Sequence, residues 1–228
     1  MRGSRSTRGP GAAAYARSRP PRGRTAWRAG SYCAVDLELS GLDPKRDEIV
    51  SFGAVPIEDG RVQIGAAVQG RARPRGSLGE ASIRIHGLRA ADLAHAPRLE
   101  VAIDTLLGVM AGRIPVVHVA AIERGFLRPA LRPLGLRLRK PMIDTSVLGL
   151  VWLHERDGHA PRRISLGELA GELGLPAHSP HDALGDALTT AQTFIALASH
   201  LGARSPETVR SLTTADRRLE SLLAYQLR

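Results

Sequence analysis

Residues 35–43 read VDLELSGLD, in which Asp36 and Glu38 stand one residue apart inside an otherwise apolar, strand-like run. Successive side chains of a β-strand point to opposite faces, so the pattern predicts both carboxylates on one face and Val35, Leu37 and Leu39 on the other. Neighbouring carboxylates raise each other's pKa unless a cation or water screens them. The run is therefore either a half-exposed strand whose polar face meets solvent or one wall of a divalent-metal site.

The segment around this run is typical of an antiparallel sheet. Apolar runs at residues 31–40, 48–57 and 61–70 predict three strands. An acidic residue followed by Gly60 separates the last two runs, and that combination favours a β-hairpin. We therefore expect three antiparallel strands at the start of the folded domain.

Helical patterns dominate the rest of the chain. Residues 98–112 carry apolar side chains at helical spacing, and the β-branched run at 114–119 predicts a short buried strand that joins the sheet in parallel. Further helices are expected at about residues 120–134, 145–154, 166–173, 180–200 and 206–227. The predicted fold class is α/β, with a mixed sheet of three antiparallel strands plus parallel additions, flanked by helices.

Positive charge is concentrated at the N-terminus. The chain has 228 residues and a net charge of +10, and eight arginines lie in residues 1–30, which contain no acid. Because this segment is rich in Gly, Pro, Ser and Arg and poor in large apolar residues, we expect a disordered tail. The tail is either an arm that strengthens phosphate binding, a neutral solvated extension or an overlong start.

Composition also bounds the environment of the protein. The hydrophobic content of 43% is that of a globular protein, and no run is long enough to cross a bilayer, so we expect a soluble protein with no membrane partner. Cys33 is the sole cysteine, which excludes an intramolecular disulfide and is compatible with a reducing compartment. Residues 1–30 lack the continuous apolar segment of a secretory signal. We therefore expect a cytoplasmic protein.

Two further acids and a histidine stand in informative places. Glu123 belongs to the apolar face of the helix expected at residues 120–134, where an unpaired acid is rare. It is either a functional acid near the rim of the sheet or a first-turn acid favoured by the helix dipole. Ser179 predicts a helix start, which puts His181 in the first turn and Asp186 about one and a half turns later.

Together these residues form the inventory of a two-metal phosphoesterase. Mg²⁺ and Mn²⁺ prefer carboxylate oxygens, and such a site needs several acids that hold two ions about 4 Å apart. A neutral histidine takes the proton of the attacking water. The groups available are Asp36, Glu38, Glu123, Asp186 and His181. Spacing alone leaves open whether they converge, because a lone Asp such as Asp186 is more often part of a solvent-exposed helix face.

Three stretches of this sequence resemble the motifs of the DnaQ-like 3′–5′ exonucleases of the DEDDh type, a family with a ribonuclease-H-like fold. The first is residues 35–62, which include the turn after the two acids. The second is HVAAIE at residues 118–123, where the family has His-Asn-x-x-Phe-Asp, so that Glu123 stands in place of the usual Asp. The third is His181, followed five residues later by Asp186.

The resemblance covers about residues 31–201 and implies a role for each matched residue. It implies that Asp36 bridges two Mg²⁺ or Mn²⁺ ions and that His181 is the general base. The other implied metal ligands are Glu38, Glu123 and Asp186. The implied substrate contacts are Leu39, Ser40, Gly41, His118 and Asp144, and the stretch around His86 is a further family landmark.

The implied function is a metal-dependent exonuclease that hydrolyses phosphodiester bonds at the 3′ ends of DNA or RNA, with release of nucleoside 5′-monophosphates, in proofreading, repair or RNA trimming. Its expected partners are a nucleic acid with a free 3′ end and a polymerase or repair complex. The alternative is a catalytically weakened nucleic-acid-binding or polymerase-associated domain of the same fold, because the extra methylene of Glu123 displaces its oxygen atoms. We expect the exonuclease domain at residues 31–203 and a helix at 204–228 that packs on it or docks a partner.

Overall fold

One mixed sheet forms the centre of the computed structural model, which describes residues 9–139 and 141–226. Its strands are β1 (Tyr32–Leu39), β2 (Ile49–Glu58), β3 (Arg61–Val62), β4 (Val68–Arg71), β5 (Ile114–Val117) and β6 (Ile143–Asp144). The strand order is β3-β2-β1-β5-β6, and β4 also pairs with β2. Strands β1 to β4 pair antiparallel, whereas β5 and β6 add in parallel. The predicted mixed α/β class is confirmed.

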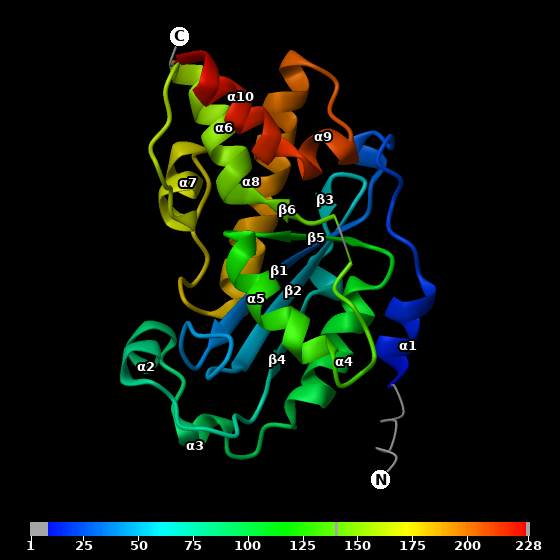
Figure 1. Cartoon of the computed structure of the whole chain (residues 1–228), viewed down its shortest axis with the longest axis vertical. Coiled ribbons are helices and arrows are strands. Elements are labelled where there is room, and N and C mark those ends of the chain that lie inside the picture. The colour runs from blue at the N-terminus through cyan, green and yellow to red at the C-terminus, as the bar shows by residue number, and fades with distance from the viewer. Residues whose placement is uncertain (1–8, 140, 227–228) are drawn as a thin grey trace.

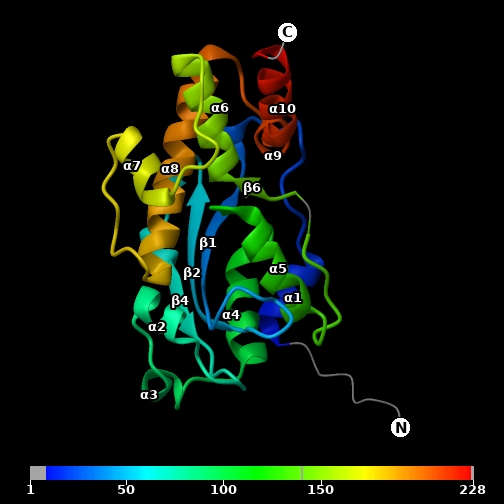
Figure 2. The ribbon, with the colours of Figure 1, turned by 60° about the vertical axis from the view of Figure 1, so that its left-hand side comes forward.

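Helices cover both faces of this sheet. They are α1 (Pro10–Arg17), α2 (Glu80–His86), α3 (Ala90–Leu93), α4 (Leu99–Met110), α5 (Ala120–Leu131), α6 (Thr145–Asp157), α7 (Leu166–Glu172), α8 (Ala183–Arg204), α9 (Val209–Thr213) and α10 (Ala215–Gln226), with short 3-10 turns η1 (Trp27–Ala29) and η2 (Ile64–Ala66). Figure 1 shows the arrangement, and in Figure 2 the strands stand between α6 and α8 on one side and α4 and α5 on the other. None of the helices in the described part of the chain is long and apolar enough to span a bilayer.

Strand β1 separates two hydrophobic cores. Val35, Leu37 and Leu39 pack into the core under α4 and α5. The opposite face of β1 contributes to a second core with α8, and alternation puts Asp36 and Glu38 on that face. The predicted division of this strand into an apolar and an acidic face is confirmed.

The predicted hairpin is confirmed, whereas two other predicted elements are interrupted. The hairpin around Gly60 forms as expected, since Asp59 and Gly60 both have positive φ and β2 pairs antiparallel with β3. The strand expected at residues 61–70 is interrupted by η2, where the side chain of Ile64 is 62% exposed and contributes nothing to the core. The helix expected at residues 206–227 likewise divides at Thr214 into α9 and α10.

The expectation of a disordered N-terminal segment is wrong for residues 9–30. Helix α1 packs on α4, and the carboxylate of Asp104 accepts hydrogen bonds from the backbone N–H groups of Gly11 (3.1 Å) and Ala12 (2.7 Å). Tyr15 is buried, and the guanidinium of Arg139 lies 4.5 Å from the centre of its ring. The small residues of this segment predict disorder when taken alone. In the structure they allow α1 and α4 to approach closely, since a Cβ at Gly11 would lie 1.8 Å from the carbonyl oxygen of Asp104. Residues 1–8 lie outside the described residues.

Residues 18–30 continue along the molecule to its C-terminal helices. The ring of Trp27 packs edge-on against Phe194 of α8, with ring centres 6.2 Å apart. The carbonyl of Thr25 accepts a hydrogen bond from Val209, and Ala26 forms a β-bridge with Thr208. The N-terminal segment therefore links α4 to α8 and α9, and α10 in turn packs on α6.

Val119 holds a conformation that a β-branched residue rarely adopts. It precedes α5 with φ 66° and ψ 67°, in the left-handed region, which costs an L-residue about 1–2 kcal/mol. Asparagine tolerates this region better, so Val119→Asn is expected to raise the free energy of unfolding by roughly 1 kcal/mol in urea denaturation. The matched control is Val101→Asn, at an exposed position inside α4, where stability is expected to change little because Val and Asn have nearly equal helix propensities. A loss of stability in Val119→Asn contradicts the argument.

Candidate active site

Three carboxylates meet on the α8 side of the sheet. Asp36 and Glu38 come from β1, and Asp186 comes from the first turn of α8. One carboxylate oxygen from each residue lies within 4.8 Å of the other two. The structure therefore brings together three of the four predicted acids from segments about 150 residues apart.

Gly53 allows α8 to reach this position. It lies opposite Asp36 in the β1–β2 register. A Cβ atom at Gly53 would lie 2.0 Å from the carbonyl oxygen of Ala183 and 2.6 Å from the Cα of Leu184, so the backbone of α8 rests on β2 where no side chain fits. This contact sets the height of the first turn of α8 above the sheet and carries Asp186 to the acids of β1.

The start of α8 differs from the prediction. The helix begins at Ala183 with Asp182 as its N-cap, whose carboxylate accepts a hydrogen bond from the N–H of Gly185 (3.1 Å). Gln69 of β4 also donates to Asp182 (2.7 Å), which anchors the cap to the sheet. The cap is therefore Asp182 instead of Ser179, because its carboxylate satisfies the free N–H of Gly185 and is held there by the sheet.

His181 lies before α8 and not within its first turn. Its backbone is in the left-handed region, with φ 64°, and its side chain is exposed. Its N–H donates to Oδ2 of Asp186 over 2.9 Å. The structure thus places His181 next to the acidic cluster, although by a loop conformation that helical spacing did not predict.

The three clustered carboxylates share a strongly unfavourable environment for negative charge. Burial raises the pKa of Asp36 well above its usual value, and the charges of Glu38 and Asp186 raise it further. Burial and the charge of Asp186 raise the pKa of Glu38 to about 7. Burial also raises the pKa of Asp186, although the hydrogen bond from the N–H of His181 partly opposes this shift.

Glu123 stands beside the cluster and outside the group of three. Only 4% of its surface is exposed, and its Oε2 atom has no hydrogen-bond partner among the described residues. Burial raises the pKa of Glu123 well above its usual value, and the charge of Asp36 adds to the shift. Because a buried, unpaired carboxylate is costly, the position of Glu123 points to a group that the protein alone does not supply.

A divalent metal ion fits these observations. The cluster offers only carboxylate oxygens, which hard cations such as Mg²⁺ and Mn²⁺ prefer, and the unpartnered oxygen of Glu123 adds a further possible ligand. A bound cation would offset the mutual repulsion that raises the pKa values of Asp36 and Glu38. The donor set therefore suits a divalent ion, with Asp36, Glu38 and Asp186 as its core.

The turn after β1 is held by Asp47 and His86. The hydroxyl of Ser40 donates to Oδ1 of Asp47 (3.1 Å), and the side chain of Leu39 is buried in the core. The carbonyl of Leu39 lies 3.2 Å from Nε2 of His86, and the N–H of Leu88 donates to Nδ1 of the same ring. Of the predicted substrate contacts here, Leu39 and Ser40 thus have side chains already engaged within the protein.

His118 and Asp144 connect α5 to neighbouring elements. The ring nitrogens of His118 lie 2.9 Å from Oγ1 of Thr145 and 3.1 Å from the carbonyl oxygen of Ile164. The carboxylate of Asp144 accepts hydrogen bonds from the N–H groups of Val119 (3.1 Å) and Ala120 (2.8 Å), and it also caps α6. Both residues therefore position the start of α5, the helix that carries Glu123.

Sequence reasoning assigned no role to three residues that shape the site: Gly53, Gln69 and His86. Burial lowers the pKa of His86, and the charge of His181 acts in the same direction. The stretch around His86 was noted as a family landmark, which is a signal for its importance. Gly53 and Gln69 carry no such signal, because each acts through a contact with a segment far along the chain.

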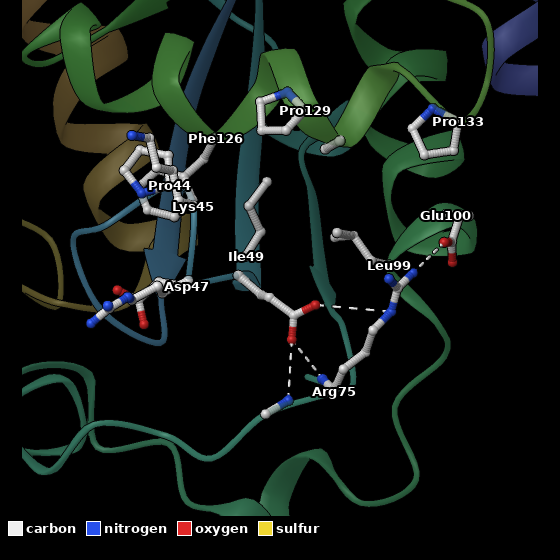
Figure 3. Close-up of a pocket in the computed structure, with 14 residues that line it drawn as sticks. Pro44, Lys45, Asp47, Ile49, Arg75, Leu99, Glu100, Phe126, Pro129 and Pro133 are labelled. Atoms are coloured by element: carbon white, nitrogen blue, oxygen red, sulfur yellow. Dashed lines mark hydrogen bonds and ion pairs between the residues drawn. The ribbon is translucent and has the colours of Figure 1, made fainter.

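The groove in Figure 3 is separate from the carboxylates. It has a volume of about 420 Å³ and lies between α5, the start of α4 and the loop before β2. Phe126, Pro129 and Pro133 form one wall, and Arg75 forms an ion pair with Glu100 on another. None of the clustered acids lines this groove.

Comparison with known proteins agrees with this geometry. A family model described as Exonuclease matches residues 33–194, which include all four acids and His181. The chain belongs to the exonuclease family. The predicted family resemblance is confirmed.

Relatives of this chain include bacterial proteins named for DNA polymerase III. The chain is 31% identical over 191 residues to a protein from Rhodobacter capsulatus named DNA polymerase III subunit epsilon-like protein. The aligned region covers 82% of this chain and 26% of the relative. The chain is 33% identical over 166 residues to the DNA polymerase III PolC-type of Thermotoga petrophila, covering 72% of this chain and 12% of the relative. The chain thus matches about a quarter or less of these relatives.

Solved structures show the same fold. The structure titled "Exonuclease X in complex with 5′ overhanging duplex DNA" superposes with a TM-score of 0.61 at 21% identity, covering 81% of this chain and 98% of the other. This similarity confirms the ribonuclease-H-like exonuclease fold expected for the chain.

We expect Gly53→Ala to separate α8 from β2. The new Cβ would meet backbone atoms that move only with the helix, so the free energy of unfolding is expected to fall by about 1–3 kcal/mol, as for other overpacked sites. Mn²⁺ affinity, measured by calorimetry, is expected to fall as well, because Asp186 moves with α8. The control is Gly65→Ala, where a Cβ has open space. Unchanged Mn²⁺ binding in a folded Gly53→Ala protein contradicts this role.

Metal-free protein is expected to lose stability as pH rises from about 4 to about 7. The raised pKa values of Asp36, Glu38 and Asp186 mean that the folded state binds more protons than the unfolded state in this range, so the free energy of unfolding decreases with pH. Urea denaturation in EDTA measures the slope, and Asp36→Asn is expected to flatten it. Mn²⁺, which displaces these protons, stabilises more at pH 8 than at pH 5. A flat profile in EDTA would show that the carboxylates titrate normally.

Proposed function

We propose that this chain is a metal-dependent 3′–5′ exonuclease of the DEDDh type, which hydrolyses phosphodiester bonds at the 3′ ends of nucleic acids and releases nucleoside 5′-monophosphates. The observation that carries the proposal is the convergence of Asp36, Glu38 and Asp186 within the region that matches the exonuclease family. The relatives named as DNA polymerase III proteins support the further proposal that this chain acts together with a polymerase or repair complex.

The four acids divide the task of binding two Mg²⁺ or Mn²⁺ ions. The charge of Asp36 raises the pKa of Glu123, and the charges of Glu38 and Asp186 raise the pKa of Asp36. Because Asp36 interacts with each of the other three acids, it is the residue that would be shared between two bound ions. When bound, the ions stabilise negative charge on the attacked phosphate and on the leaving oxygen.

His181 is proposed as the general base. Its backbone is tied to Asp186, while its exposed ring is free of hydrogen bonds among the described residues. In the reaction the ring accepts a proton from water as the water oxygen bonds to phosphorus, and the bond between phosphorus and the 3′-oxygen of the preceding nucleotide breaks. That oxygen leaves with the bonding electrons and takes a proton from solvent.

The turn at residues 39–41 is the proposed contact for the terminal nucleotide. It follows Glu38 directly, so its backbone lies next to the acids, and the absence of a side chain at Gly41 lets the carboxylate of Asp47 pack against the turn. For His118 and Asp144 the hydrogen bonds support an indirect part in substrate binding, through the position of α5.

A weakened, non-catalytic domain is the second candidate. The observation in its favour is that Glu123, in place of the usual Asp, stands outside the group of three carboxylates. The two candidates differ in metal binding. For the weakened domain, calorimetry is expected to detect no binding of Mn²⁺ at millimolar concentrations. This candidate also predicts that Glu123→Asp creates nuclease activity where the unmodified protein has little.

The direct test is degradation of 5′-labelled single-stranded DNA and RNA in Mg²⁺ or Mn²⁺. We expect a ladder of products shortened from the 3′ end, with release of 5′-monophosphates. Asp36→Ala is expected to reduce the rate by at least about a thousandfold, since it removes the shared metal ligand. Asp59→Ala, on the hairpin turn at the far end of β2, is the control for loss of an acid. Full-length label after long incubation in both metals refutes the enzyme.

A further inference from the structure

Helix α5 carries a row of arginines on its exposed side. Arg124, Arg128 and Arg132 recur every four residues, which places them on one side of the helix, with Arg128 and Arg132 exposed and Arg124 partly exposed. None of the three forms an ion pair with an acid in the described part of the chain. Arg75 and Arg156, by contrast, are each paired with a glutamate.

No ion pair within the described residues accounts for this row. Like charges four residues apart destabilise a helix by a few tenths of a kcal/mol per pair. The helix dipole favours Arg128 in the last turn of α5, whereas Arg124 lies in the first two turns, near the positive end of the dipole. Asp144 and Asp216 line the same pocket as Arg124 without pairing with it, so the guanidinium groups of the row stay available to a ligand.

The row begins one residue after Glu123, the acid that α5 contributes to the candidate site. Helix α5 runs from the end of β5 toward α4 (Figure 1). From Arg124 to Arg132 the helix axis advances by about 12 Å. The groove of Figure 3 lies on another side of α5 and does not include these arginines; its lining mixes acids with bases.

We propose that Arg124, Arg128 and Arg132 form a phosphate track that binds the backbone of the nucleic acid leading to its 3′ end. The proposal rests on the proposed exonuclease function and adds to it the part of the protein that holds the rest of the strand. Guanidinium groups bind phosphate oxygens in a bidentate manner, and about 12 Å matches three to four nucleotides at roughly 3.4 Å each. Positive charge on the helix that carries Glu123 also opposes the repulsion between a polyanion and the acids of the site.

The test compares a triple variant with a charge-matched control. The first carries Arg124→Gln, Arg128→Gln and Arg132→Gln, which remove the charge and keep an unbranched polar side chain of similar helix propensity. The control carries Arg19→Gln, Arg22→Gln and Arg24→Gln, three exposed arginines in the N-terminal segment that also lack ion pairs among the described residues. Thermal melting checks that both fold; relief of repulsion leaves the α5 variant at least as stable as the unmodified protein.

Two measurements carry the comparison. The first is fluorescence anisotropy of a labelled twelve-nucleotide oligothymidylate in EDTA at several NaCl concentrations. Because the α5 variant can no longer neutralise the phosphates along the track, its slope of log affinity against log salt is expected to become shallower by about 2, whereas the control keeps its slope. The second is cleavage in Mn²⁺, where the KM for the twelve-nucleotide strand is expected to rise about tenfold at low salt, while a dinucleotide, too short for the track, is cleaved as before.

The outcomes separate this proposal from the proposed function. An unchanged salt slope, or a slope changed equally in the control, refutes the track whether or not the protein is a nuclease. Equal loss of dinucleotide and long-strand cleavage also refutes it, because the arginines would then act at the reacting bond. If the unmodified protein cleaves neither substrate, the exonuclease proposal fails, while the anisotropy measurement still decides whether α5 binds the strand.

Discussion

The arrangement of the site depends on the contact between the backbone of α8 and Gly53 of β2. The carbonyl of Ala183 occupies the space that a side chain would fill, so the first turn of α8 lies as close to the sheet as a backbone can. Gly53 is opposite Asp36 in the sheet register, and the same contact therefore places Asp186 beside the acids of β1. The hydrogen bond from Gln69 to Asp182 holds the start of the helix in this position.

The carboxylates that this contact assembles oppose one another. Burial and mutual repulsion raise the pKa values of Asp36 and Glu38, while the pairing of β1 with β2 and β5 and the packing of two cores against it hold the pair in place. Backbone strain occurs in two segments that carry site residues, because Val119 precedes the helix of Glu123 and His181 precedes the helix of Asp186, and both have positive φ. Local strain and unpaired charge that persist in a well-packed domain are characteristic of functional sites.

Helix α5 has one face in the interior near the candidate site and one face at the surface. Its buried side carries Glu123 among apolar residues, and its exposed side carries the arginine row. Asp144 accepts hydrogen bonds from the first N–H groups of α5 and also caps α6, so one carboxylate aligns both helices. A change at Asp144 would therefore reach Glu123 and the arginines together, although it lies in neither group.

Patterns of short period in the sequence correctly predicted the acidic face of β1, the hairpin at Gly60 and helix α4, because alternation and helical spacing depend on neighbouring residues. The order of residues 9–30 was missed, since it rests on Asp104 and Phe194, which lie far along the chain. The start of α8 shifted from Ser179 to Asp182 for the same reason, a partner on β4. The sequence by itself determined which acids share a face of β1 and which family the chain belongs to. Only the tertiary structure decided that Asp186 joins them and that Glu123 stands to one side, because both positions follow from how α8 and α5 pack on the sheet.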